Sequence, residues 1–177
     1  MRDKLDSLFK AYDIRGIYPN EIDEQLSFDI GYALSKYIND DTFVIGHDAR
    51  LSSESLFNAF SSGIMSNGKK IKYIGLVPMD VVYTMSGLLN MPGAMITASH
   101  NPKNWNGFKL CKAGAKPIGI ESGLEEIKEL VSLSNKYKES TSISKEDIFE
   151  DYLKHIKSIV NFKEINTNLK IGLDGGS

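Results

Sequence analysis

The chain has 177 residues, 41% hydrophobic and 25% charged, so it can build one core of ordinary size and part of a second. Its formal net charge of -2, from 21 basic and 23 acidic residues, argues against a dedicated nucleic-acid or anionic-membrane surface. No apolar run reaches the length of about 18 residues that a membrane-spanning helix needs, and the single cysteine, Cys111, can form no internal disulfide. We therefore expect a soluble, cytoplasmic protein.

The N-terminal region offers one unusual pair of charges. The first ten residues alternate charged and apolar side chains and lack the apolar core of a signal peptide. Residues 11–20 are predicted to be a loop, because glycine, proline and asparagine punctuate them. Within this loop, Asp13 and Arg15 stand between apolar neighbours. The pair is either a solvated ion pair, which composition alone favours, or part of an anchored loop that presents the Arg15 guanidinium to an oxyanion.

The middle of the chain alternates helices with short apolar strands. Helices are predicted at 23–39, 53–67, 80–90, 120–133 and 144–160, and strands at 43–46, 71–77 and 93–98, with a hairpin over 107–118. Ser144 and Asp147 resemble a capping box that opens the last helix. This alternation predicts an α/β layered sandwich, with a mixed, mostly parallel sheet and helices on both faces.

A polar loop follows the strand that ends at Ala98. It begins Ser99-His100-Asn101-Pro102, and Asn106-Gly107 is expected to turn the chain into the next apolar run. A serine hydroxyl at the end of a buried strand can carry a phosphoryl group if cations and backbone N–H donors surround it. Lys109 and Arg15 could supply the charge, and Lys109 could also move protons. Without further context, a serine in such a loop is more often a simple turn residue.

Other site chemistries fit the residues less well. A serine hydrolase is the rival interpretation, but Ser99 lacks the Gly-x-Ser-x-Gly surroundings of a nucleophile elbow. A catalytic triad is defined by geometry and not by sequence order, so that alternative stays open. No cluster of Asp or His residues has the spacing of metal ligands.

Four segments together resemble one known family. Thr97-Ala98-Ser99-His100-Asn101-Pro102, followed by Asn106-Gly107-Phe108-Lys109, resembles the active-site serine loop of the α-D-phosphohexomutases, the phosphoglucomutase/phosphomannomutase superfamily. Tyr12-Asp13-Ile14-Arg15-Gly16 is similar to the family's N-terminal loop, and Gly46-His47-Asp48-Ala49-Arg50 to its Gly-x-Asp-x-Arg segment. Leu173-Asp174-Gly175-Gly176 resembles the start of its second domain.

The resemblance implies an isomerase that moves a phosphoryl group between O6 and O1 of a hexose through a phosphoserine and a bisphosphosugar. It implies that Ser99 carries the phosphoryl group and that Lys109 is the general acid/base. Arg15 and His100 would support the phosphoryl group, and Tyr12, Arg15 and Lys109 would contact the substrate. Mg²⁺ would bind the phosphate on Ser99 together with three aspartates of a second-domain loop.

The departures from the family pattern predict an incomplete enzyme. The chain contains no Asp-Gly-Asp-Gly-Asp loop, no Glu-x-Ser-Gly loop and no Arg-x-Ser-Gly-Thr segment. The resemblance therefore implies a first domain over residues 1–160, and a linker with the first strand of a truncated second domain over 161–177. The expected partners are hexose phosphates, hexose bisphosphate and the missing domains of the same polypeptide, and the isolated chain is expected to be inactive. The alternative is a free-standing, non-catalytic binding module derived from a mutase domain.

Overall fold

The computed structural model describes residues 2–131, 136–137, 143–160, 168 and 170–174. Contacts divide the chain into two compact units, residues 1–147 and 148–177, and the domain boundary expected at 160/161 stays a prediction. The expected linker lies outside the described residues except for Asn168, and residues 170–174 of the expected last strand carry no strand. None of the helices in the described ranges has the length and apolar character of a membrane span.

A mixed sheet, with six strands in the described part of the chain, forms the centre of the first unit. The strands are Ile14–Ile17 (β1), Thr42–His47 (β2), Lys70–Leu76 (β3), Gly93–Ile96 (β4), Trp105–Lys112 (β5) and Lys116–Pro117 (β6). Their order is β1-β5-β4-β2-β3, with β6 paired to β5. Strands β3, β2 and β4 form a parallel core, and β5 runs antiparallel to β4, β1 and β6. The α/β open sheet predicted from the alternation of elements is confirmed.

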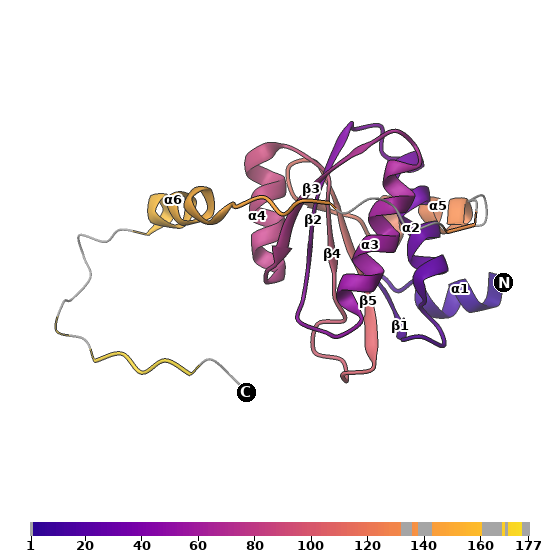
Figure 1. The fold of residues 1–177 in the computed structure, drawn as a ribbon, viewed down its shortest axis with the longest axis horizontal. Helices are drawn as coiled ribbons and strands as arrows, with labels where there is room; N and C mark the ends of the chain where they lie inside the picture. Colours follow the sequence, from indigo (N-terminus) through magenta and orange to yellow (C-terminus); the bar gives the residue numbers. More distant parts are fainter. Residues whose placement is uncertain (1, 132–135, 138–142, 161–167, 169, 175–177) are drawn as a thin grey trace. The chain divides into compact units, whose positions relative to one another are not determined.

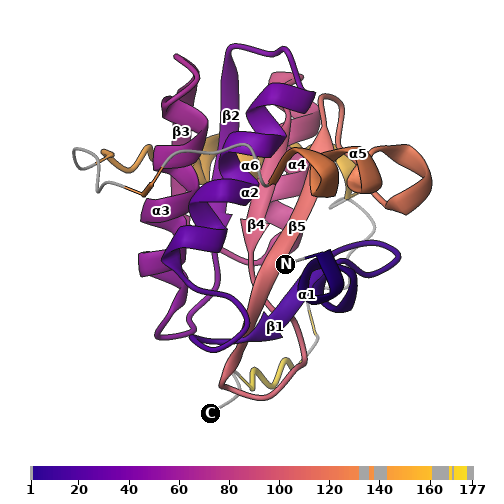
Figure 2. The ribbon, with the colours of Figure 1, turned by 90° about the vertical axis from the view of Figure 1, so that its right-hand side faces the viewer.

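Helices cover both faces of this sheet (Figure 1). They are Arg2–Leu8 (α1), Glu24–Tyr37 (α2), Ser53–Met65 (α3), Met79–Leu89 (α4) and Leu124–Leu130 (α5), with a short 3₁₀ turn at Ile120–Ser122 (η1). Helices α2, α3 and α5 lie on one face, where their apolar residues form the main core with β2, β4 and β5 (Figure 2). Helix α4 lies on the opposite face against β2 and β4. In the second unit, Phe149–Ile159 (α6) has no buried residue among those described.

The prediction of a loop over residues 11–20 is wrong for the centre of this segment, where β1 forms. Ile14 is fully buried and pairs opposite Phe108, and Arg15 pairs opposite Gly107. A strand of four residues has too few alternations to stand out in a sequence, and its stability here comes from the neighbouring strand β5. The helix predicted at 23–39 is observed as α2, which is capped by Asp23, whose carboxylate accepts the N–H of Leu26 at 2.8 Å.

Two local signals of turns and caps are overridden by tertiary contacts. Asn106-Gly107 does not turn the chain but lies inside β5, where a Cβ on Gly107 would stand 2.0 Å from the Ile14 carbonyl oxygen. The capping box at 144–147 does not open a helix either. Lys145 bridges to Tyr73 of β3 and the Glu146 N–H donates to the Tyr73 carbonyl, so this segment is extended and α6 begins only at Phe149.

Candidate functional site

Three loops meet at the carboxyl ends of the parallel strands. They follow β2, β3 and β4, as expected for a ligand site of an open α/β sheet. A cavity of about 430 Å³ opens between them. Its lining residues come from all three loops, from β4 and from the first residue of α4, and they are Asp48, Pro78, Met79, Met95, Thr97, Ser99 and His100.

Ser99 stands exposed at the tip of the β4 loop. Its φ of 56° lies in the left-handed region, which residues other than glycine adopt rarely and at a cost of about 1 kcal/mol or more. The Ser99 N–H donates to Thr97 Oγ1 at 2.8 Å, and the Asn101 N–H donates to the Ala98 carbonyl at 3.1 Å. The backbone of the turn is therefore held from inside the protein while the hydroxyl faces outward.

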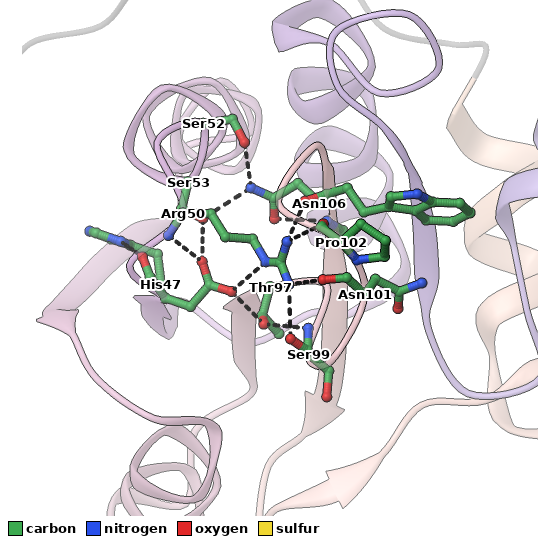
Figure 3. A network of polar contacts seen from close by, with 12 residues as sticks. His47, Arg50, Ser52, Ser53, Thr97, Ser99, Asn101, Pro102 and Asn106 are labelled. Atoms are coloured by element: carbon green, nitrogen blue, oxygen red, sulfur yellow. Dashed lines mark hydrogen bonds and ion pairs between the residues drawn. The ribbon is translucent and has the colours of Figure 1, made fainter. Parts of the chain in front are cut away.

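Asp48 connects this loop to β2 and α3 (Figure 3). Its Oδ2 accepts the Thr97 hydroxyl at 2.7 Å and the Arg50 Nε–H at 3.1 Å. Its Oδ1 accepts the Arg50 backbone N–H at 3.0 Å and the Ser53 hydroxyl at 2.5 Å. One carboxylate thus ties the start of α3 to the strand end that precedes Ser99.

Asn106 anchors the far end of the serine loop. It is fully buried, and its side-chain amide donates to Ser52 Oγ at 2.8 Å and to Ser53 Oγ at 3.0 Å. Its Oδ1 accepts the Gly107 N–H at 2.8 Å. A buried amide with all these partners fixes where β5 begins, and so fixes the far end of the loop.

A charged cluster beside the loop consists of Asp13, just before β1, Arg15 of β1 and Lys109 of β5. Asp13 Oδ2 lies 2.6 Å from Arg15 Nη2 and 3.0 Å from Lys109 Nζ, and Arg15 Nη1 donates to Asn101 Oδ1 at 2.5 Å. Phe108 stacks on Phe60 of α3, so the next residue, Lys109, points to the opposite face, which α4 partly covers. Burial raises the pKa of the Tyr83 phenol in α4, and the charges of Cys111 and Asp13 raise it further.

The structure places the predicted site residues in two connected groups. Ser99 and His100 line the 430 Å³ cavity. Arg15 and Lys109 share Asp13, and Arg15 reaches the serine loop through Asn101. Tyr12 is 76% exposed and its ring lies beside Gly119, so it belongs to neither group in this structure. The roles of these residues stay predictions.

From the sequence alone, no catalytic or binding role is assigned to Asp48, Arg50, Thr97 or Asn106, although all four build the loop. A signal was present in two of them, since Asp48 and Arg50 directly follow an apolar strand, as Ser99 does. What the sequence lacks is the distance between the strands, which decides whether their loops meet. Cys111 of β5 packs as a small buried side chain that is 1% exposed, and burial raises the pKa of its thiol.

The described residues contain no group of three or more His, Cys, Asp or Glu side chains that could hold a metal ion. Ser99 would offer at most the oxygens of a phosphate attached to it, and Asp48 and Asp13 are occupied by hydrogen-bond donors and cations. Mg²⁺ prefers six oxygen ligands in near-octahedral geometry. The residues that the structure describes therefore do not form a magnesium site by themselves.

Comparison with known proteins gives one consistent result. The family model described as phosphoglucomutase/phosphomannomutase, alpha/beta/alpha domain I, matches residues 6–138. A protein of Xanthomonas campestris pv. campestris (strain B100) named phosphohexose mutases is 36% identical over 172 residues, and an Escherichia coli phosphomannomutase is 33% identical over 175. Each alignment covers 96% of this chain, and the chain spans 38% of the length of these relatives.

Solved structures agree with the sequence relatives. A putative phosphomannomutase from Thermus thermophilus superposes with a TM-score of 0.78 at 25% identity, over 88% of this chain and 36% of that one. A phosphoglucomutase/phosphomannomutase family protein from Burkholderia thailandensis gives a TM-score of 0.75 at 28% identity, over 86% of this chain and 35% of that one. The similarity therefore covers most of this chain but only part of each solved protein.

Proposed function

The chain belongs to the phosphoglucomutase/phosphomannomutase family, in which it matches the first α/β/α domain, and we propose that it acts within a phosphohexomutase. The reaction is the interconversion of hexose 6-phosphate and hexose 1-phosphate through a phosphoserine and a hexose bisphosphate. The observation that carries this proposal is the exposed Ser99 hydroxyl, presented at the end of β4 on a backbone held by Thr97 and Arg50. An outward hydroxyl on a fixed backbone suits in-line phosphoryl transfer, because that reaction depends mainly on positioning and charge.

The transfer step moves the phosphoryl group from the Ser99 oxygen to an oxygen of the sugar. A hydroxyl oxygen of the sugar attacks the phosphorus of phosphoserine 99, the bond between phosphorus and Ser99 Oγ breaks, and a new ester bond to the sugar forms. The sugar hydroxyl releases a proton and the serine oxygen accepts one. Repeating the step in reverse from the other end of the bisphosphosugar restores the phosphoserine and gives the isomeric monophosphate.

The charged cluster supplies the groups that this exchange needs. Lys109 is proposed to carry the proton between the two oxygens, with the Asp13 carboxylate 3.0 Å from its ammonium group. Arg15 and His100 are proposed to support the phosphoryl group, and Tyr12 to contact the sugar. Two cations and one carboxylate leave the cluster with one net positive charge, which favours an anionic substrate.

The rest of the site is proposed to come from Mg²⁺ and from further domains of the same polypeptide. Mg²⁺, which would neutralise phosphate charge, would take an oxygen of the Ser99 phosphate and further ligands from outside the described residues. We propose that these ligands, and the groups that select the sugar, belong to further domains of the same polypeptide. The chain's coverage of only 38% of its relatives supports this.

Replacing Ser99 tests the proposed function. In the protein expressed from its complete reading frame, Ser99→Ala is expected to lower kcat for hexose 1-phosphate isomerisation by on the order of 10⁴-fold, because the phosphoryl carrier is gone. Turnover is followed by coupled detection of hexose 6-phosphate. The matched control is Ser144→Ala, an exposed serine on an extended segment, which should leave turnover unchanged.

Normal turnover by the Ser99→Ala protein would overturn the proposal. A wild-type protein that binds hexose phosphates without isomerising them would instead support the alternative of a non-catalytic binding module.

A further inference from the structure

The guanidinium group of Arg50 is fully engaged by the protein itself. Its Nε–H donates to Asp48, and its four terminal N–H groups donate to four backbone carbonyls of the serine loop (Figure 3). These carbonyls belong to Pro102 at 2.6 Å, Asn101 at 2.7 Å, Ser99 at 2.8 Å and Trp105 at 3.0 Å. An arginine has five N–H donors, and here each has an acceptor. No donor of Arg50 is left for a phosphate.

The same contacts fix the two peptide groups on either side of Ser99. Thr97 Oγ1 holds the Ser99 N–H at 2.8 Å, and Arg50 Nη2 holds the Ser99 carbonyl at 2.8 Å. Thr97 and Arg50 are in turn joined, because both donate to Asp48 Oδ2. The left-handed φ of 56° at Ser99 is thus held from both ends by a chain of hydrogen bonds that closes on one carboxylate oxygen.

The direction of these bonds determines what faces the ligand. In a trans peptide the C=O and the following N–H point in opposite directions. Since the Ser99 carbonyl points at Arg50, the His100 N–H points away from it, and the Ser99 hydroxyl also points away from the guanidinium in Figure 3. The positive charge of Arg50 therefore reaches the outer side of the loop through an oriented peptide dipole and not by direct contact.

We propose that Arg50 is a positioning residue that presets the serine loop for phosphoryl transfer and does not itself bind the phosphoryl group. The inference rests on the proposed function and deepens it. Arg50 holds the loop in one conformation, so the Ser99 hydroxyl and the His100 N–H face the substrate before it arrives. The phosphoryl group is then met by Arg15 and Lys109, whose charges lie in the separate Asp13 cluster.

The first test is Arg50→Lys in the protein expressed from its complete reading frame. An ammonium group keeps the charge but has three donors and no planar fork, so it cannot hold four carbonyls and Asp48 together. We expect kcat to fall by on the order of 10²-fold, as for a small misplacement of a reacting group, and KM for hexose phosphate to change little. The matched control is Lys103→Met, which removes an exposed cation from the same loop and should change neither constant.

The second test is chemical rescue. Arg50 lines a second cavity of about 990 Å³, so a small cation can reach the space that its side chain leaves. Added guanidinium is expected to restore part of the kcat of Arg50→Gly, whereas added ammonium is not, since only the planar cation bridges several carbonyls. If Arg50→Gly does not fold, Asp48→Asn is the second variant, and it is expected to lower kcat with little change in KM.

Three results would overturn the inference. One is a KM increase with unchanged kcat in Arg50→Lys, which would make Arg50 a direct phosphate ligand. The others are wild-type kinetics in Arg50→Lys and equal rescue of Arg50→Gly by ammonium and guanidinium. Failure of the proposed function would give a different result, because Ser99→Ala would then keep its turnover, independently of the kinetics of the Arg50 variants.

Discussion

Asp13 is the residue on which the two cations of the site converge. Its carboxylate touches Arg15 and Lys109, and its side chain is only 9% exposed. The sequence alone shows that the cluster has one acidic and two basic side chains. That Arg15 and Lys109 both contact the same oxygen, Asp13 Oδ2, depends on the pairing of β1 with β5. Asp13 therefore sets the distance between the proposed phosphate-binding arginine and the proposed proton carrier.

Replacing Asp13 with asparagine should leave two cations side by side without their counter-charge. We expect Asp13→Asn to lower the free energy of unfolding by about 2 kcal/mol, as for a buried ion pair that loses one partner. Sulfate should restore more stability to this variant than it adds to the wild type, because the anion can replace the lost carboxylate. Thermal and urea unfolding, each with and without sulfate, measure both effects.

The control for this change is Asp41→Asn. Asp41 pairs with Lys69 at 3.7 Å, but its side chain is 96% exposed. Its loss should change the free energy of unfolding by less than about 0.5 kcal/mol. Equal stabilities of Asp13→Asn and Asp41→Asn, at any sulfate concentration, would show that Asp13 does not hold the two cations.

Residue types alone predicted part of the site. Ser99, Arg15 and Lys109 drew attention as a nucleophile and two cations near a strand end, and the structure connects Arg15 and Lys109 through one carboxylate. The contacts of Arg50 with the serine loop could not be predicted in the same way. Its acceptors are backbone carbonyls, which every residue carries, so no side-chain pattern marks them.

Helices α2 and α3 pack backbone against backbone. A Cβ on Gly31 would lie 2.0 Å from the Phe60 carbonyl oxygen, and a Cβ on Gly63 would lie 2.1 Å from the Phe28 carbonyl oxygen. These reciprocal contacts leave no space for any side chain at either position. They also fix the place of α3, whose first turn carries Ser53, a hydrogen-bond donor to Asp48.

The glycine contact predicts a sharp difference between two helical glycines. Gly31→Ala should lower the free energy of unfolding by about 3 kcal/mol, because the helices must separate to admit the methyl group. Gly87 of α4 is exposed, and a methyl group added there would have Ala115 Cβ as its nearest neighbour, at 3.8 Å. Gly87→Ala should therefore raise stability by about 0.5–1 kcal/mol through helix propensity. Denaturant unfolding of the two variants gives the comparison, and similar losses in both would refute the close contact.

Sequence patterns predicted the long elements better than the short ones. Helices α2, α3 and α4 and strands β2, β3 and β4 lie within a few residues of their predicted ranges, because each carries several periodic apolar residues. The short elements α1 and β1 were not predicted. The turn signal at Asn106-Gly107 and the cap signal at Ser144 failed because long-range partners, Ile14 and Tyr73, compete with the local preference.

At the scale of the whole molecule, the sheet joins two halves of the site. The parallel strands β2, β3 and β4 bring the loops of Asp48, Pro78 and Ser99 to one edge, and the antiparallel strands β5 and β1 place the Asp13 cluster beside them. The alternation of helices and strands predicted this fold class. It could not predict the exact strand order, since that depends on which apolar faces pack together in three dimensions.

The residue that carries the phosphoryl group is the most direct test of the proposed mechanism. The protein expressed from its complete reading frame is incubated with a hexose 1,6-bisphosphate, and its peptides are then analysed by tandem mass spectrometry. With an isotopically labelled bisphosphate we expect one labelled phosphoryl group, on Ser99, and none in Ser99→Ala. Added unlabelled hexose monophosphate should exchange this label for an unlabelled phosphoryl group, because each turnover restores the phosphoserine. A protein that turns over its substrate with Ser99 unmodified, or with the phosphoryl group on another residue, would contradict the mechanism.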